Sequence, residues 1–459
     1  MLTRLSIGNF KSWKRIKEMR LGQITGLFGT NSSGKTSILQ LLLMLKQTIE
    51  SSDRAQVLEF GDEKSLTNLG SFRDVVYGHE KPGMVDFSLD WKLAKPLFVS
   101  DPKSKTRTLF SGDQLAFRCS LGEDGGDRLT VSHLVYDLGN SHFSLRRKGQ
   151  SGAKYELTAQ GVTNQGEEFR FVRAPGRVWD WPAPVKFYGF PDQVYAYFQN
   201  AGFLSKLQLE FEHLFGRLYY LGPLREFPQR HYAWKGSEPA DMGRRGERVV
   251  DAMLASKQRG RHISPGYKKR KETLEERVAH WLKVLGLIHD FRVEPIAEGN
   301  NIYQVRVQRT PSSAYVLITD VGFGVSQILP VLVLCYYVPP GSIILLEQPE
   351  IHLHPSVQSG LADVFIDAMK NRNVQIVVES HSEHLLRRLQ RRIAEQEIMP
   401  EQTALYFCEV TETGSRLQGL DVDLFGTIRN WPKDFFGDEF SEMAAITKAA
   451  MERKKEQQA

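Results

Sequence analysis

Residues 29–36 read Gly-Thr-Asn-Ser-Ser-Gly-Lys-Thr and have the spacing of a phosphate-binding loop. The glycines allow a tight turn whose backbone N–H groups point at phosphate oxygens. The lysine adds a positive charge near the β and γ phosphates, and the threonine offers a hydroxyl to Mg²⁺. An apolar stretch precedes the loop and a leucine-rich helical stretch follows it, as such a loop requires. The predicted nucleotide ligands are Gly29, Thr30, Asn31, Ser32, Ser33, Gly34, Lys35 and Thr36.

Acidic residues and a histidine follow two other short apolar stretches. Glu347 ends the first stretch, and Glu350 comes three residues later. A carboxylate at the C-terminal edge of a strand can hold Mg²⁺ opposite Thr36, whereas the alternative is an acidic turn in solvent. His381 follows the second stretch, where it is well placed to touch a γ-phosphate. These residues are therefore candidates for the second half of the nucleotide site.

A second glycine-rich segment precedes the apolar helix expected over 325–335. Gly322, Gly324, Ser326 and Gln327 lie at the start of this helix and form another N–H-rich anion site. A monomer needs only one such cradle for each nucleotide. The segment thus suggests that the second cradle of one molecule covers the nucleotide bound by another, with an ordinary helix cap as the alternative.

The hydrophobic pattern indicates how these residues are positioned. Short continuous apolar runs such as 343–346 and 374–378 are typical of strands buried on both faces of a parallel sheet. Strands and helices alternate at both ends of the chain, which predicts one α/β sheet. Short alternating runs between about 85 and 173 predict a β-rich region, and 194–214 is expected to be helical. The β-rich and helical region would be inserted into the α/β sheet.

Composition narrows the class of protein. The chain has 459 residues, 41% of them hydrophobic, which argues against a disordered chain. No apolar run reaches the ~18 residues of a membrane span, and the N-terminus lacks the pattern of a signal peptide. The three cysteines form no pair with metal-ligand spacing. We expect a cytoplasmic protein without a membrane partner.

Positive charge is concentrated in one segment. Residues 243–273 hold ten Lys and Arg and three Asp and Glu, a net charge of +7, whereas the whole chain carries +6. Such a cluster can bind the phosphate backbone of DNA, or it can be a solvated mobile loop. A second cluster, Arg387, Arg388, Arg391 and Arg392, lies on the helix expected after His381.

Together these motifs resemble the ABC-type ATPases of the SMC/RecF/OLD kind, in particular the AAA15/21 type that carries a small C-terminal domain of unknown function. The resemblance covers about residues 1–80 and 300–410, and residues 430–438 are similar to the C-terminal domain. It implies a P-loop NTPase of ABC type with a mixed sheet, flanking helices and a β-rich plus helical insertion. The expected domains are an ATPase core formed by 1–80 and 300–410, an insertion over 81–299, and a C-terminal domain over 411–459.

The resemblance also implies a mechanism. ATP and Mg²⁺ would lie between two copies arranged head to tail, with Lys35 and Thr36 of one copy binding the nucleotide. Gly324 and Ser326 of the other copy would close over the γ-phosphate. Glu347 falls on the Mg²⁺-linked acid, and His381 falls on the switch histidine.

The chain departs from the family pattern next to Glu347. The residue after this acid is usually the carboxylate that polarises the attacking water, but here it is Gln348. An amide can orient water but cannot accept its proton. Either Glu350 takes over, or hydrolysis is slow. No glutamine matches the loop that senses Mg²⁺ after the first helix, and Asp74 lies in about the right region.

Two classes of function follow. The first is a DNA-associated ATP-driven motor or sensor, such as the ATPase subunit of a bacterial anti-phage or genome-maintenance system. The second is an ATP-gated scaffold that holds and releases a protein effector. About 50 residues follow Cys408, too few for the Toprim nuclease domain of OLD proteins, so a nuclease or toxin activity would come from a partner. A group of acids is read as a solvated surface in preference to a metal site: Asp421, Asp423, Asp434, Asp438 and Glu439.

Overall fold

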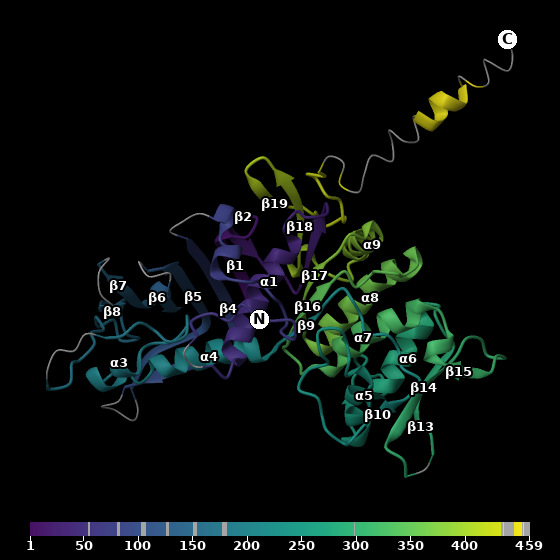
Figure 1. Cartoon of the computed structure of the whole chain (residues 1–459), viewed down its shortest axis with the longest axis horizontal. Coiled ribbons are helices and arrows are strands. Elements are labelled where there is room, and N and C mark those ends of the chain that lie inside the picture. Colours follow the sequence, from purple (N-terminus) through teal and green to yellow (C-terminus); the bar gives the residue numbers. More distant parts are fainter. Residues whose placement is uncertain are drawn as a thin grey trace.

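The computed structural model of the chain contains two large β-sheets with helices between and around them (Figure 1). It describes residues 1–53, 56–79, 83–101, 107–124, 128–149, 154–176, 181–297, 299–432, 435, 445–451 and 453. Strands and helices alternate in the six-stranded sheet, so the predicted α/β class is confirmed. In the described part of the chain, no helix combines the length and the apolar character needed to cross a bilayer.

The six-stranded sheet carries the ends of the predicted motifs. In spatial order its strands are β19 (Gly414–Gly419), β18 (Thr403–Thr411), β3 (Ile24–Gly29), β17 (Gln375–Glu379), β16 (Ile343–Glu347) and β9 (Leu218–Leu221). All neighbouring pairs are parallel except β18 and β19. The carboxyl ends of β3, β17, β16 and β9 therefore meet at one edge of the sheet. Strands far apart in the sequence thus bring their terminal residues together.

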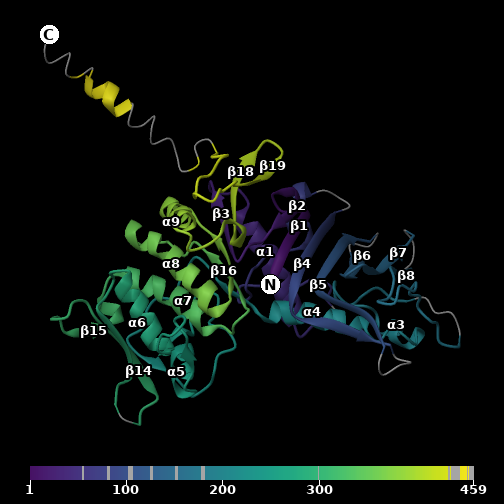
Figure 2. The same ribbon diagram turned by 180° about the vertical axis from the view of Figure 1, so that it is seen from behind.

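Helices bury both faces of this sheet. Side chains on β16 alternate between two apolar clusters, because Ile343 and Leu345 belong to one and Ile344 and Leu346 to the other. Figures 1 and 2 show α7, α8 and α9 on the side away from the seven-stranded sheet, whereas α1 lies between the two sheets. These helices are α1 (Lys35–Glu50), α7 (Phe323–Tyr337), α8 (Pro355–Arg372) and α9 (Glu383–Ala394).

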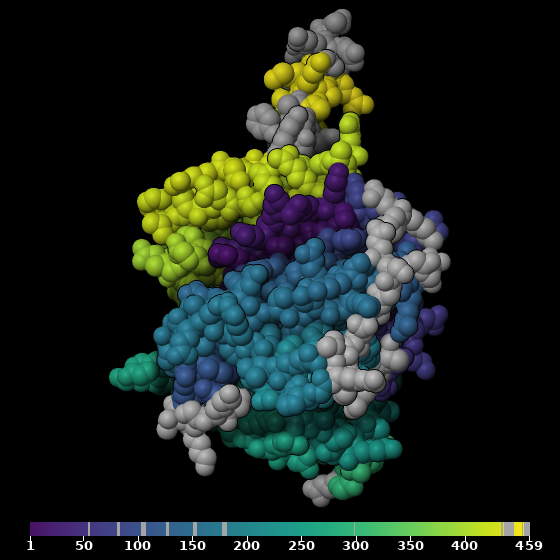
Figure 3. Space-filling model, turned by 90° about the vertical axis from the view of Figure 1, so that its left-hand side faces the viewer, coloured from purple at the N-terminus to yellow at the C-terminus, as the bar shows by residue number. Residues whose placement is uncertain are grey.

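The seven-stranded sheet is antiparallel throughout and joins the N-terminal strands to the predicted β-rich region. Its order is β2 (Trp13–Arg20), β1 (Leu2–Phe10), β4 (Met84–Ser100), β5 (Thr108–Glu123), β6 (Leu129–Leu138), β7 (Ser141–Lys148) and β8 (Lys154–Gln160). The sheet spans the predicted boundary at residue 80, and β9 from the predicted insertion joins the six-stranded sheet. Figure 3 shows the N-terminal residues between the β-rich region and the C-terminal strands. The predicted domains are thus interleaved in space.

Aromatic side chains pack the buried face of the seven-stranded sheet. Phe211 of α4 (Leu204–Gly216) contacts Trp91 and Phe117, with ring centroids 5.8 and 4.7 Å apart. The helix predicted over 194–214 is two helices, because residues 198–203 separate α4 from α3 (Asp192–Tyr197). Within this gap the Asn200 side chain accepts a hydrogen bond from the Val172 backbone, which fixes a turn instead of a helix.

The remaining elements flank α7. They are α5 (Val249–Gln258), α6 (Leu274–Val284), β10 (Tyr232–Ala233), β11 (His262–Ile263), β12 (Glu272–Thr273), β13 (Asp290–Pro295), β14 (Ile302–Gln308) and β15 (Tyr315–Leu317). Short helical turns are α2 (Phe72–Val75), η1 (Tyr77–His79), η2 (Ile318–Asp320) and η3 (Pro400–Gln402). Asp74 accepts hydrogen bonds from the backbone and hydroxyl of Ser71, so its carboxylate caps α2.

Candidate functional site

The phosphate loop leads from β3 into α1, as the sequence predicts. Gly29 and Gly34 have φ angles of +134° and +87°, and a Cβ at Gly29 would lie 2.0 Å from a backbone oxygen. Only glycine fits there without a shift of the neighbouring strand. Lys35 Nζ donates to the Thr30 carbonyl at 2.6 Å and the Gly29 carbonyl at 3.1 Å. The lysine therefore satisfies its donors within its own loop when no phosphate is there to accept them.

Three buried carboxylates stand at the same edge of the sheet. Glu347, Glu350 and Glu379 are less than a tenth exposed. Glu347 and Glu379 end the parallel neighbours β16 and β17 and are register partners. Lys35 supplies the opposite charge in this group. Burial lowers the pKa of Lys35, and the nearby charges of Glu379 and Glu350 raise it by a smaller amount. The predicted acids and the phosphate loop thus form one electrostatic cluster.

The Thr36 hydroxyl contacts Glu379. Thr36 Oγ1 donates to Glu379 Oε1 at 2.9 Å, and the other oxygen of Glu379 is buried without a partner. Glu347 instead accepts a hydrogen bond from the Tyr220 hydroxyl at 3.0 Å. Oxygen ligands of this kind suit Mg²⁺, so the site fits the ion. The carboxylate nearest to Thr36 comes from β17, which lies between the strands that carry the phosphate loop and Glu347.

Burial disfavours the charged form of all three carboxylates. Loss of hydration, then repulsion by Glu379, raises the pKa of Glu347 to about 7, against the opposing effects of Tyr220 and Arg225. Burial likewise raises the pKa of Glu379 and of Glu350. A cation that binds here would relieve this unfavourable burial of negative charge.

We expect Glu347→Gln to stabilise the nucleotide-free protein at alkaline pH. The folded-state pKa of Glu347 lies above its unfolded value, so the parent loses stability as pH rises from about 4.5 to 7. At pH 8 the variant should exceed the parent by about 1–3 kcal/mol in free energy of unfolding, and at pH 5 by much less. Urea unfolding in EDTA measures this. A difference independent of pH would contradict it, and Glu63→Gln, at an exposed position, serves as control.

The structure brings Glu350 and His381 together and places Gln348 beside them. Glu350 Oε1 accepts a hydrogen bond from the His381 backbone N–H at 2.6 Å, and its second oxygen is buried without a partner. Gln348 has a left-handed φ of +43°, and its backbone N–H donates to the Glu379 carbonyl at 2.8 Å. Burial, then the charge of Lys35, lowers the pKa of His381. Glu350 therefore keeps a free carboxylate oxygen in the cluster.

The second glycine-rich segment forms the start of α7, as predicted. Gly322 caps the helix without a side-chain hydrogen bond, and a Cβ on Gly322 would meet open space. Ser326 donates to the Phe323 carbonyl at 2.9 Å, and Ser326 and Gln327 are each 7% exposed. Among the described residues, no hydrogen bond or ion pair joins Gly322, Gly324, Ser326 or Gln327 to the phosphate loop. Within one chain the two cradles are separate.

Sequence reasoning missed three residues of this edge: Tyr220, Arg225 and Glu379. Glu379 ends a buried strand just as Glu347 does, so the strand-end rule that selected Glu347 would have selected it too. Tyr220 and Arg225 belong to β9 and the turn after it. No local pattern in the sequence shows that β9 pairs with β16.

Ion pairs engage five of the ten cations in the predicted basic segment. Arg259 and Arg261 both pair with Glu238 at 2.7 Å. Arg245, Lys257 and Arg270 pair with Glu226, Glu275 and Glu276. The four arginines of α9 pair with Glu383, Asp363 and Glu395. Lys268, Lys269 and Lys271 are exposed and form no ion pair with another described residue.

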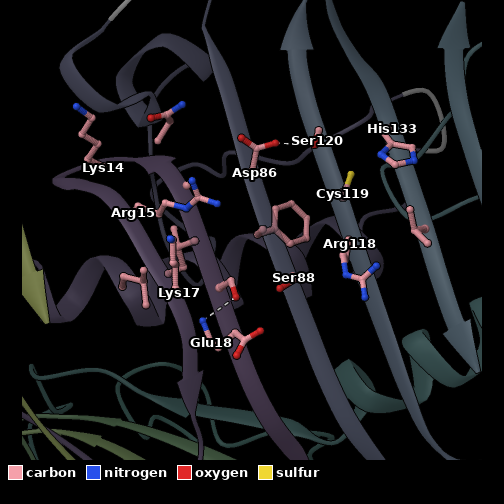
Figure 4. A pocket seen from close by; sticks show the side chains of 17 residues that line it. Lys14, Arg15, Lys17, Glu18, Asp86, Ser88, Arg118, Cys119, Ser120 and His133 are labelled. Atoms are coloured by element: carbon pink, nitrogen blue, oxygen red, sulfur yellow. Dashed lines mark hydrogen bonds between the residues drawn. The ribbon is translucent and has the colours of Figure 1, made fainter. Parts of the chain in front are cut away.

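A hollow of about 1160 Å³ lies on the polar face of the seven-stranded sheet (Figure 4). Lys14, Arg15, Lys17 and Arg118 line it together with Glu18 and Asp86. Arg118 also pairs with Asp137, at 2.5 Å. The mixed charges of this hollow, and a lining that includes no residue of 29–36, set it apart from the nucleotide site.

Two C-terminal aromatics pack on the core. The Phe435 ring lies 4.7 Å from Phe407 and 4.9 Å from Trp431, and the Arg387 guanidinium lies 4.5 Å above Trp431. Asp423 accepts two backbone hydrogen bonds within its own turn. Phe436, Asp434, Asp438 and Glu439 lie outside the described residues.

The strand order, the phosphate loop and the acids at the carboxyl edge define a P-loop NTPase of ABC ATPase type. Residues 253–386 match the family model of the AAA ATPase domain, and residues 398–446 match a protein family of unknown function, DUF3696. The predicted combination of an AAA ATPase domain with this C-terminal domain is confirmed. The first match includes Glu347, Gln348, Glu350 and His381, whereas the phosphate loop lies before it.

The chain also resembles solved SMC heads. An SmcHead bound to the C-winged helix domain of ScpA shares 10% identity and a TM-score of 0.46, with 92% of this chain and 98% of that chain covered. The SMC head domain from Thermotoga maritima shares 11% identity and a TM-score of 0.38, with 92% and 99% covered. The Smc head domain bound to the C-terminal domain of ScpA from Pyrococcus furiosus is 8% identical in sequence, with a TM-score of 0.44. The match covers 92% of this chain and 96% of that chain. No curated protein sequence matches the chain.

Proposed function

We propose that the chain binds ATP with Mg²⁺ on residues 29–36 and hydrolyses it. The observation that carries this proposal is the contact between Thr36 and Glu379 at 2.9 Å, beside Lys35 and two further buried carboxylates. A phosphate loop beside a cluster of three buried acids suits a divalent cation between the phosphates and the acids. Bound Mg²⁺ would neutralise charge on the phosphates, and Thr36, Glu379 and Glu347 would hold it.

The residues of the chain divide the remaining work. Backbone N–H groups of residues 29–36 bind the phosphates, and Lys35 exchanges its loop carbonyls for phosphate oxygens. Glu350 has a free buried oxygen and a raised pKa, so its carboxylate accepts the proton of the attacking water. The backbone N–H of His381 donates a hydrogen bond to Glu350, and the His381 side chain contacts the γ-phosphate.

Two copies of the chain assemble around ATP. In the part of the chain that the structure describes, no hydrogen bond or ion pair joins the start of α7 to the phosphate loop, so its N–H groups serve a nucleotide on another copy. Two exposed phenylalanines lie at this helix start. Phe227 and Phe323 are 64% and 59% exposed, and their rings lie 6.1 Å apart. Such a patch marks a protein contact surface.

Ser326→Arg should block ATP-dependent assembly. The arginine would fill the start of α7 with a bulky side chain, whereas Lys35 and Thr36 would be untouched. Native mass spectrometry with a non-hydrolysable ATP analogue should show a dimer for the parent and a nucleotide-bound monomer for the variant. Leu424→Arg, at a side chain that is 63% exposed, serves as the control. A variant that assembles like the parent would refute the role of this segment.

Two uses of this ATPase remain distinct. In the first, DNA bound to the basic segment stimulates turnover, as in a bacterial defence or genome-maintenance ATPase. The exposed and unpaired Lys268, Lys269 and Lys271 favour this use. In the second, the chain holds a protein effector, which the exposed Leu424 and Phe425 of the C-terminal region favour. We put DNA first because three neighbouring free cations suit a phosphate backbone.

Duplex DNA should accelerate ATP turnover, and replacing Lys268, Lys269 and Lys271 with glutamine should remove most of this stimulation. Each lost phosphate contact also lowers the salt dependence of DNA binding. Replacing Arg387 and Arg391 with glutamine is the matched control, because their charges are already paired. Turnover that does not respond to DNA, together with an effector that co-purifies only with one nucleotide state, would favour the scaffold.

A further inference from the structure

Arg225 is a buried cation that the proposed mechanism does not use. It lies in the turn after β9, whose carboxyl end meets that of β16 at the edge of the sheet that holds the carboxylates. Its side chain is 4% exposed. All three guanidinium nitrogens are buried, and none has a hydrogen-bond acceptor among the described residues.

An unpaired guanidinium is an unusual group to bury. Removing a charged group from water without an acceptor costs several kcal/mol, so such groups are nearly always paired. Burial lowers the pKa of Arg225 to about 10, against the charges of Tyr220, Glu347 and Glu350. These neighbours balance the charge in part, but they accept no hydrogen bond from it. The N–H groups of the Arg225 guanidinium therefore lack a hydrogen-bond acceptor among the described residues.

The turn that carries Arg225 is held in place. Backbone N–H groups of Gly222 and Glu226 donate to the carbonyls of Arg244 and Arg245 at 2.7 and 2.9 Å. Glu226 also pairs with Arg245 at 3.3 Å. The backbone is thus held on both sides of Arg225, at the edge of the sheet that carries the carboxylates.

The location of Arg225 indicates what the missing acceptor is. Glu350 interacts electrostatically with Lys35 and also with Arg225, so this carboxylate lies near both cations. Lys35 belongs to the phosphate loop, and a nucleotide on this loop would extend its terminal phosphate toward the acids. A guanidinium offers paired donors that match a phosphate group. The acceptor is therefore an anionic oxygen group that is present only when nucleotide is bound.

We propose that Arg225 is a ligand of the terminal phosphate and makes the site distinguish ATP from ADP. This inference rests on the proposed nucleotide site. The same turn carries the exposed Leu224 and leads to Phe227, which contacts Phe323 at the start of α7. A ligand on Arg225 is thereby linked through a few residues to the surface proposed for assembly.

The test compares the dissociation constants of a non-hydrolysable ATP analogue and of ADP, each with Mg²⁺, by isothermal titration calorimetry. Arg225→Gln should weaken binding of the analogue by about 10–100-fold, since charge-assisted hydrogen bonds contribute about 1.5–3 kcal/mol. Affinity for ADP should change by less than about threefold. Arg225→Lys keeps the charge but loses the paired donors of the guanidinium. Its affinity for the analogue should therefore lie between those of the parent and of Arg225→Gln.

Two controls separate this role from a structural one. Arg277→Gln removes another buried arginine, one that pairs with Asp367 and Glu272, and it should lower the melting temperature without changing the preference for ATP. Arg225→Gln should melt no lower than the parent in the absence of nucleotide, because no hydrogen bond is lost. Equal losses for both nucleotides, no loss for either, or a marked fall in melting temperature would each overturn the proposal. If the nucleotide site itself is wrong, the parent will bind neither nucleotide.

Discussion

Lys35→Ala should abolish ATP binding while the chain stays folded. Among the described residues, the hydrogen bonds of Lys35 Nζ go to groups of its own loop, at 2.6 to 3.3 Å, so the loss leaves little of the fold unsupported. In the complex, the same ammonium would make charge-assisted hydrogen bonds to the β and γ phosphates. Losing about two of them should weaken binding at least about 100-fold. Equilibrium binding of a fluorescent ATP analogue measures the change.

A second buried lysine provides the matched control. Lys46 lies on the same helix, is 6% exposed and pairs with Glu50. Lys46→Ala should lower the melting temperature and leave ATP affinity within about twofold, because this side chain faces the Phe215 carbonyl and not the phosphate loop. Unchanged ATP affinity in Lys35→Ala would show that residues 29–36 are not the nucleotide site.

Glu350→Gln should slow ATP hydrolysis by about 10²–10⁴-fold, the usual effect of losing a general base. The amide can still accept the hydrogen bond from the His381 backbone, so the fold of the edge should persist. The free oxygen of Glu350 is the group that would take the proton from water. Burial raises the pKa of Glu350, which makes this carboxylate a stronger base. ATP binding should survive and the assembled form should accumulate. Single-turnover hydrolysis with a melting curve measures both effects.

Gln348→Glu is the informative partner of this variant. It restores a carboxylate at the position next to Glu347, and if Glu350 is the base it should change turnover little. The left-handed φ of Gln348 fixes the backbone there through its bond to the Glu379 carbonyl, so the substitution keeps the turn. Hydrolysis at least tenfold faster in Gln348→Glu, with Glu350→Gln lowering stability more than rate, would assign Glu350 a structural role.

Tertiary contacts decide which cations of the basic segment remain without an ion pair. Ten cations within 243–273 suggest an open phosphate-binding stretch. In the structure, however, Arg259 and Arg261 form ion pairs with Glu238, and most residues of α5, which belongs to this segment, are buried. Their partners are separated from them by about 20 residues, so no local window of the sequence shows the pairing. Lys268, Lys269 and Lys271 are neighbouring exposed cations of the segment that form no ion pair with another described residue, and the exposed Arg248 forms none either.

The sequence by itself determined the phosphate loop, the helix that follows it and the strand-end acids, because each depends on contiguous residues. A glycine-rich turn, an apolar strand and a leucine-rich helix need no distant partner to be recognised. Periodicity likewise determined the α/β class and the buried strands that end at Glu347 and just before His381.

Only the tertiary structure decided which side chains meet at the edge of the sheet. The order β3, β17, β16, β9 sets Glu379 against Thr36 and brings Arg225 beside Glu347, although these pairs are more than 100 residues apart in sequence. Parallel strands are joined through long connections, so their neighbours cannot be read from local periodicity. The pairing follows instead from how the helices bury both faces of the sheet.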